Sequence, residues 1–308
     1  MTTERTKIRH FETIDSLMKL YVCSILLVIL AHPATGAEDS KLSITPDPQA
    51  AAQFQLARAY LRGEGVPKDP GKAFELMKAA ADHGDAEAIG GLGYFYSIGL
   101  VVLKDDEQAM DWFRKGAEKG SAKAQLNYGN YLVDAKVPDY REMTRAQMHE
   151  QGRQWIRKAA DQGLPDAGLT YGRIFYFGDY GQPQDYQKAL VYLKPAAESG
   201  IADAQNILGS IYQCGAGTPI DEVAAEHWYR KAALQGHSRA QGNLGMLLGP
   251  LVEDKATRIE ALAWLLMASE QNQITATKAL SDAEPALKVG EMAEAKMKQV
   301  ELTKLVTK

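Results

Sequence analysis

Cysteine is scarce in this chain. Only Cys23 and Cys214 occur among its 308 residues. Two cysteines exclude a disulfide-stapled fold, and if Cys23 leaves with a cleaved leader, Cys214 has no partner within the chain. The sequence leaves two interpretations of Cys214, a reactive thiol or a small packed side chain. It favours packing, because free cysteine is among the most often buried residue types.

An excess of positive charge is also missing. The chain has 35 Lys and Arg against 39 Asp and Glu, a formal net charge of -4. Proteins that bind nucleic acid present a basic patch or stripe, so no nucleic-acid partner is expected. With 45% hydrophobic and 24% charged residues, the composition is typical of soluble globular proteins.

Catalytic motifs are absent as well. HExxH, CxxC, GxSxG and SxxK do not occur. The loop from Gly63 to Gly65 lacks the further glycine and the lysine that a phosphate-binding loop needs. No histidine is followed by a second kind of metal ligand at a suitable spacing; the four considered are His83, His149, His227 and His237. The sequence therefore predicts no catalytic residue, no metal, no cofactor and no enzyme activity.

The one long apolar run lies near the start. Leu20–Ala31 is followed by Pro33 and by small residues up to Ala37. A short apolar run before a small-residue site is typical of a secretory signal, here cut near Ala37. The run is short for a bilayer core of about 30 Å, although an uncleaved anchor is the alternative. Translation from Met18 would give an ordinary signal. We expect an exported protein, periplasmic or secreted, with no stable membrane insertion after cleavage.

What the chain does contain is a repeat. The string WYRKAALQGHSRAQGNLG at 228–245 has counterparts at 112–129 and 155–172, and self-similarity at a fixed period indicates a repeat architecture. After the signal (1–37) and a linker (38–49), six repeats cover 50–272 and capping helices are predicted at 273–308. The repeats are expected at 50–84, 85–120, 121–163, 164–200, 201–236 and 237–272.

Each repeat reads as a helical hairpin. Its first helix, helix A, starts at a small residue such as Ala88, with bulky and small residues four, five and eight positions later on one stripe. Its second helix, helix B, carries Ala, an aromatic residue and Ala at i, i+3 and i+7, so the repeated tryptophans are interpreted as core markers. Glycines end the helices, and Asp69 with Pro70 starts a helix B. The predicted fold is all-α, a right-handed α/α superhelical solenoid.

Two regions depart from the pattern. Repeat three has about seven extra residues between its helices, either a loop on a functional face or a lengthened helix B that begins near Thr144. After Asn272 the apolar positions Val289, Met292, Val300 and Leu305 suggest amphipathic capping helices.

The pattern A-x3-LG-x2-Y-x2-G-x-GV…D…A-x2-W-x2-KAA-x2-G resembles the Sel-one-like repeat family, a branch of the tetratricopeptide-like solenoids. The resemblance implies a scaffold: an adaptor, partner-binding regulator or assembly factor, often exported. A cysteine-rich branch has been linked to penicillin binding and hydrolysis. That branch has a cysteine pair in each repeat, which this chain lacks, so a cell-wall or β-lactam hydrolase is only the alternative.

The expected binding residues lie on the A helices. Stacked A helices usually line the concave side of a solenoid, which binds partners. The position six residues after the small residue, together with one neighbouring tyrosine, gives the candidate set Arg58, Tyr94, Asn130, Arg173, Tyr176, Ser210 and Met246. Such a row suits an extended protein or peptide segment with acidic groups, although Phe54 and Phe177 could simply pack between adjacent A helices. The expected function is that of an exported adaptor in envelope regulation, assembly or host interaction. The sequence does not indicate an oligomeric state.

Overall fold

The computed structural model describes residues 47–138 and 140–306. In these ranges the regular structure is helical throughout and no strand occurs, which confirms the all-α prediction. The expected signal and nearly all of the linker lie outside the described residues. None of the helices in the described ranges is long and apolar enough to cross a membrane.

The chain divides into two compact units between Met148 and His149. The first holds α2 (Pro48–Arg62), α3 (Pro70–Asp82), α4 (Ala86–Ile98), α5 (Asp106–Glu118), α6 (Ala122–Val133) and the short 3-10 helix η1 (Tyr140–Glu142). The division falls within α7 (Arg145–Asp161). The second holds α8 (Pro165–Phe177), α9 (Tyr186–Glu198), α10 (Ala202–Cys214), α11 (Glu222–Leu234), α12 (Ser238–Leu248), α13 (Lys255–Glu270), α14 (Ile274–Ala283), η2 (Glu284–Ala286) and α15 (Glu291–Val306).

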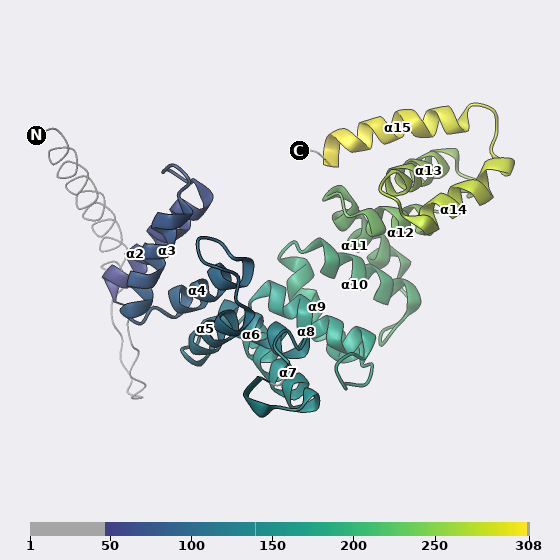
Figure 1. Ribbon diagram of the computed structural model, residues 1–308. Coiled ribbons are helices and arrows are strands. Elements are labelled where there is room, and N and C mark those ends of the chain that lie inside the picture. The colour runs from purple at the N-terminus through teal and green to yellow at the C-terminus, as the bar shows by residue number, and fades with distance from the viewer. Residues whose placement is uncertain (1–46, 139, 307–308) are drawn as a thin grey trace, which may run out of the picture. The chain divides into compact units, whose positions relative to one another are not determined.

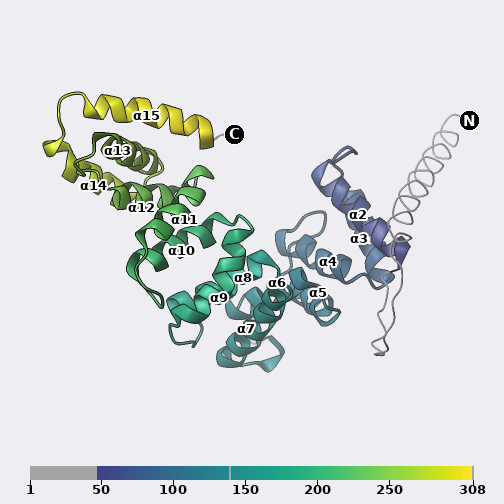
Figure 2. The same ribbon diagram turned by 180° about the vertical axis from the view of Figure 1, so that it is seen from behind.

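Within each unit the helices form successive hairpins (Figure 1). The A helices α2, α4, α8, α10 and α12 each pack against the B helix that follows, and the B helices α3, α5, α9 and α11 each pack against the next A helix. The view from behind shows the same succession of hairpins (Figure 2). Hairpins of the predicted kind are therefore present as α2/α3, α4/α5, α8/α9, α10/α11 and α12/α13. Helix α6 is followed by α7, within which the division between the units falls, and α14 and α15 follow α13.

The helix ends follow the predicted local chemistry, with one correction. Gly63 and Gly99 have φ of 77° and 68°, the left-handed conformation that glycine adopts most easily. Asp69 accepts a hydrogen bond from the Lys72 amide, as an N-cap should. Helix A, however, begins before the small residue: α4 starts at Ala86, and Ala88 is the position whose amide the N-cap Asp85 receives.

The small positions on helix A allow close contact with helix B. A Cβ on Gly209 would lie 2.5 Å from the Tyr229 ring, and one on Gly93 would lie 2.6 Å from Phe113. Both aromatic rings are almost fully buried. The glycines thus provide the space into which a large side chain from helix B fits.

The tryptophan prediction needs correction. Trp264 is fully buried, but Trp112, Trp155 and Trp228 are only half-buried. In those three repeats the next residue, Phe113, Ile156 or Tyr229, is the buried one, and Phe113 and Tyr229 lie against the helix-A glycines Gly93 and Gly209. Each half-buried ring instead lies under the lysine three positions later, with ammonium-to-centroid distances of 4.3, 4.0 and 4.9 Å. The W-x2-K string is therefore a cation–π pair at the edge of the core.

Buried glutamines join neighbouring repeats. Gln205 is 3% exposed, and its amide donates to the Ala197 carbonyl on the preceding B helix. Its oxygen accepts from Gln235 at the end of its own repeat, at 2.8 Å. Gln241 repeats the arrangement with Ala233 and Gln271. Because both polar ends of each side chain are satisfied, burial here costs little.

The extra residues of repeat three form both a loop and a longer helix. Helix α7 begins at Arg145, and Thr144 exchanges hydrogen bonds with Gln147 at its start. The lengthened helix B is therefore confirmed. Before it, Tyr140 is 5% exposed, and its hydroxyl donates to Asp111 on α5 at 2.7 Å. The segment folds back onto the first unit.

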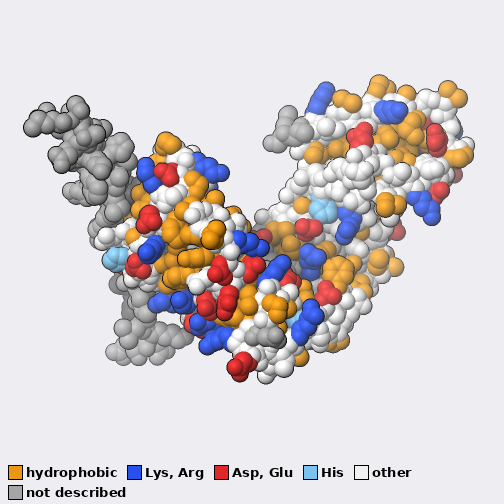
Figure 3. Space-filling view, in the orientation of Figure 1, with side chains coloured by type: hydrophobic (Ala, Val, Ile, Leu, Met, Phe, Trp, Pro, Cys, Tyr) orange, Lys and Arg blue, Asp and Glu red, His pale blue; other side chains and the backbone are white. Residues whose placement is uncertain are grey.

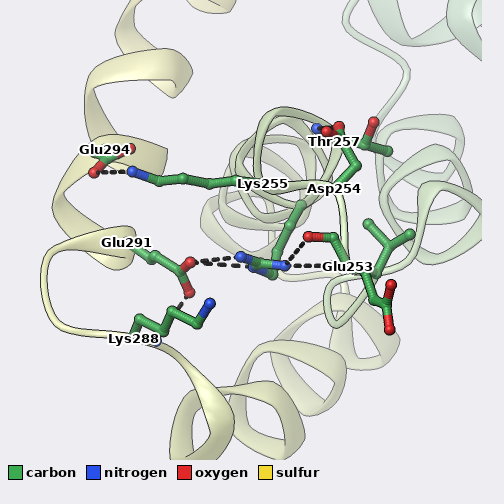
Figure 4. A network of polar contacts seen from close by, with 9 residues as sticks. Glu253, Asp254, Lys255, Thr257, Lys288, Glu291 and Glu294 are labelled. Carbon is green, nitrogen blue, oxygen red and sulfur yellow. Dashed lines mark hydrogen bonds and ion pairs between the residues drawn. The ribbon is translucent and has the colours of Figure 1, made fainter.

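The C-terminal helices cap the second unit, although through other residues than expected. Ala295 and Leu302 are the buried apolar residues of α15, whereas Val289, Val300 and Leu305 are all more than half exposed. The polar anchor is a buried ion pair: Arg258 on α13 donates to Glu291 at 2.7 Å, and Glu291 also receives the Lys288 amide. Figure 4 shows this network, with Lys255 reaching Glu294 beside it. These contacts hold the pKa of Glu291 below its ordinary 4.5.

A basic groove on the A helices

A groove of about 600 Å³ lies along the A helices of the first unit. Its wall and floor come from α2, α4 and α6, the A helices of three successive repeats. The residues that line it are Phe54, Arg58, Leu61, Arg62, Lys68, Met77, Glu87, Gly90, Gly91, Tyr94, Ile98, Leu100, Ser121, Lys123, Ala124 and Asn127. A volume in this range is typical of binding clefts.

The groove is basic in an acidic protein. Arg58, Arg62, Lys68 and Lys123 line it, against Glu87 as the one acidic lining residue. Arg58 is held over the Phe54 ring at 5.8 Å and donates to Gln55. Hydrophobic side chains gather over the N-terminal helices in Figure 3, with Lys and Arg among them.

Closely packed helices form the floor of the groove. A Cβ on Gly90 would lie 2.7 Å from the Ala124 Cβ, so α4 and α6 approach closely there. Gly91 similarly leaves room for Met77. The absence of side chains at these two positions lets Ala124 and Met77, which also line the groove, pack closely against α4.

The candidate residues of the first unit divide in two. Arg58 and Tyr94 line the groove, and Tyr94 is 48% exposed. Asn130 is half-buried on α6 and is not among the lining residues; Asn127, one turn earlier, takes that place. Phe54 is half-buried against the core and also lines the groove, so both interpretations of that ring hold.

A smaller groove of about 270 Å³ lies on the A helices of the second unit. Arg173 lines it and lies 5.8 Å from the centroid of Phe177, which is 50% exposed. Asp203 and His237 face each other across it at 3.1 Å. His237 Nδ1 also accepts the Ala240 amide and so caps α12.

The other candidates of the second unit pair with each other or face solvent. Tyr176 donates to Ser210 at 3.3 Å, and both are half-buried. Met246 is 39% exposed on α12. None of the three is among the lining residues of the 270 Å³ groove. In the first unit the structure thus brings Arg58 and Tyr94 to one groove, and in the second unit it brings Tyr176 and Ser210 into contact.

Two expectations about reactive groups concern metal ligands and the thiol of Cys214. No group of three or more His, Cys, Asp or Glu side chains that could hold a metal ion occurs in the ranges 47–138 and 140–306. Cys214 is exposed at the end of α10, so the expectation of a packed thiol was wrong. Its helix ends there, and the side chain lies beyond the packed stripe.

The repeats match a known family. The Sel1 repeat describes residues 50–85, 86–121, 148–164, 171–201, 202–237 and 238–273, which is more than half of the chain. The chain belongs to the Sel1 repeat family. Proteins of this family are generally interaction scaffolds, and the match confirms the resemblance seen in the sequence.

Solved Sel1 repeat structures agree with the fold. A protective antigen of uropathogenic Escherichia coli with an SLR fold superposes with a TM-score of 0.71 and 28% identity, over 83% of this chain and 54% of that one. A Sel1 repeat protein from Oxalobacter formigenes gives a TM-score of 0.61 and 31% identity, over 74% and 91%.

Curated relatives are longer proteins. An uncharacterized protein of Neisseria meningitidis is 27% identical over 75% of this chain and 45% of its own length. The chitin synthase regulator SKT5 of Saccharomyces cerevisiae is 26% identical over 71% and 32%. The Sel1 repeat protein described here thus spans less than half the length of these relatives.

Sequence reasoning missed several groove residues. Lys123 and Glu87 lie in the first turns of their A helices, outside the predicted row of positions six residues after the small residue. Ile98 and Leu100 flank the glycine that ends α4. One signal was available in the sequence: Phe54, Arg58 and Arg62 are spaced four residues apart. Residues at this spacing share a helix face, so the three could have been assigned to one surface.

Proposed function

We propose that this Sel1 repeat protein is an exported scaffold that binds a protein partner in the groove of its first unit. The observation that carries the proposal is the groove itself: three successive A helices supply a wide, open, basic surface with an exposed tyrosine. Exposed Tyr and Arg are enriched where protein interfaces concentrate their binding energy.

The comparisons support a binding role in general terms. The family is one of interaction scaffolds, and two of the curated relatives are chitin synthase regulators by name. Those proteins are much longer than this chain, so their partners are not transferred to it. We propose only that this chain acts by binding a protein partner.

Site-specific photocrosslinking tests the groove. A photoreactive amino acid replaces Tyr94 in the full chain, expressed in the native cells. The matched control places it at Lys78, an exposed residue on helix α3 of the same unit that is not among the groove's lining residues. We expect a discrete protein adduct from position 94 and none from position 78. Equal adducts from both positions, or none from position 94, would contradict the proposal.

Export is tested separately. The apolar run Leu20–Ala31 and the small residues after it support a cleaved signal. We expect the native protein outside the cytoplasm, with its N-terminus at Glu38. A cytoplasmic protein that retains residues 20–37 would overturn the export part and leave the groove part standing.

A further inference from the structure

The charge of the first groove selects the sign of its ligand. Arg58, Arg62, Lys68 and Lys123 line it with only Glu87 opposing them, while the whole chain is acidic. Arg62 is partly neutralised by Glu64 at 3.4 Å, where both side chains are more than half exposed. Complementary charge governs which partners are admitted, so the groove favours an acidic segment.

The groove edge is also unusually apolar. Residues 99–104, the loop between α4 and α5, follow Ile98, which is 50% exposed and lines the groove together with Leu100. Further along the loop Val101 is 54% and Leu103 is 90% exposed. Surface apolar side chains that gather beside a polar rim mark interaction sites.

One residue of the loop has a backbone conformation that its side chain disfavours. Val101 has φ of 72°, whereas the equivalent positions Gly65 and Gly217 have φ of 73° and 70°. A β-branched residue in the left-handed region is a genuine outlier. Strained residues of this kind concentrate at ligand clamps and switch regions. Glycine would satisfy the fold, so the valine side chain calls for another explanation.

We infer that the first groove takes an acidic segment of a protein partner, with a large apolar side chain of that segment seated on the 99–104 loop. This rests on the proposed scaffold function and names the class of partner. An anionic membrane is the less suitable occupant, because several of the cations line a recessed groove of about 600 Å³ that a flat bilayer surface does not enter.

A displayed library of random peptides, selected on the purified full chain, provides the probe. We expect the enriched peptides to carry net negative charge and at least one large apolar residue. Their affinity, measured by fluorescence anisotropy, should fall as salt concentration rises, because exposed charges are screened. Enrichment of basic or uncharged peptides, or no enrichment, overturns the inference.

Matched variants locate the contact. Lys123→Glu reverses a charge in the groove and is expected to weaken the selected peptide at least about tenfold. Lys78→Glu makes the same change on helix α3 and should leave the affinity within about twofold. An equal effect of the two changes overturns the groove as the site.

The loop is tested by changes that leave the fold intact. Leu103→Ser alters a side chain that is 90% exposed, so the melting temperature should hold while peptide affinity falls. Val101→Gly removes the side chain and the backbone strain while the loop keeps its conformation, so thermal stability should hold or rise while affinity falls. Unchanged affinity in both variants overturns the role of the loop.

The remaining outcomes separate this inference from the scaffold function. The selected acidic peptide, present in excess before irradiation, should suppress formation of the protein adduct at position 94. An adduct that still forms to the same extent overturns the acidic segment and leaves the scaffold function standing. Binding to phosphatidylglycerol vesicles that is lost in Lys123→Glu, without peptide binding, would favour the membrane occupant and overturn the inference.

Discussion

Two glycines on one helix should respond to alanine in opposite ways. Gly242 and Gly245 both lie within α12. A Cβ on Gly245 would meet Leu265 Cγ at 2.7 Å and the Ala261 carbonyl oxygen at 2.8 Å. A Cβ on Gly242 would meet only the methyl groups of Ala268 and Ala276 at 3.6 Å, an ordinary contact.

The magnitudes follow from two opposing effects. Alanine is favoured over glycine in a helix interior by about 1 kcal/mol. Overpacking costs about 1–3 kcal/mol, and the upper part of that range applies to Gly245 because one clash is with the backbone of α13. Gly242→Ala should therefore raise the free energy of unfolding by up to about 1 kcal/mol. Gly245→Ala should lower it by about 1–2 kcal/mol.

Thermal unfolding followed by circular dichroism and calorimetry measures the difference. In a unit of this size 1 kcal/mol shifts the melting temperature by about 2–4 °C, so the two variants should differ by at least about 2 °C. The transition to compare is that of the second unit, because repeat proteins need not unfold in a single step. A Gly245→Ala variant as stable as Gly242→Ala would refute the close-packing argument.

Three further predictions concern burial and protonation. Trp264→Ala should lower the free energy of unfolding by about 3–5 kcal/mol, since the side chain is fully buried and its indole donates to Glu260. Trp155→Ala removes a half-buried ring under Lys158 and should lower it by less than half as much. Urea unfolding of the two variants measures the difference. The contacts around Glu291 lower its pKa, so its contribution is complete above the ordinary value of 4.5 and is lost as pH falls through the lowered pKa. Melting temperatures between about pH 3 and 6 should fall less steeply towards acid in Glu291→Gln, and identical slopes would contradict the prediction. Burial and the neighbouring Asp106 raise the pKa of Tyr131 to about 12. The stability that Tyr131 contributes should therefore persist to about pH 10 and disappear towards pH 12. In an alkaline titration followed by ultraviolet absorbance, Tyr131→Phe should show one late-ionising tyrosine fewer.

Local chemistry explains why so much of the fold was predictable. A helix end depends on a few adjacent residues, so Gly63, Gly99 and Asp69 could be assigned from the sequence. The bulky and small alternation on helix A likewise survives in the structure as the fit of Tyr229 over Gly209. Family membership follows from the same regular residues.

Prediction failed where the outcome depended on how two helices meet. The helix-B residue buried against helix A is Tyr229 rather than Trp228. One helical position is a rotation of about 100°, which helix packing decides. The same holds for α15, where Ala295 and Leu302 face inward and Val300 does not.

The groove contains both residues that the sequence predicted and residues that it missed. Arg58 and Tyr94 were found because residues at a constant repeat position share a helix face. Lys123, Ile98 and Leu100 come from helix ends and a loop, and they join the same surface only once α2, α4 and α6 lie side by side.

By itself, the sequence determined the repeat, the hairpin and the ends of its helices, because these depend on contacts between near neighbours in the chain. The tertiary structure alone decided which side chains surround a common space, which rings are fully buried and which basic residues line the same groove. Those properties depend on the separation and rotation of helices tens of residues apart, and no local pattern encodes them.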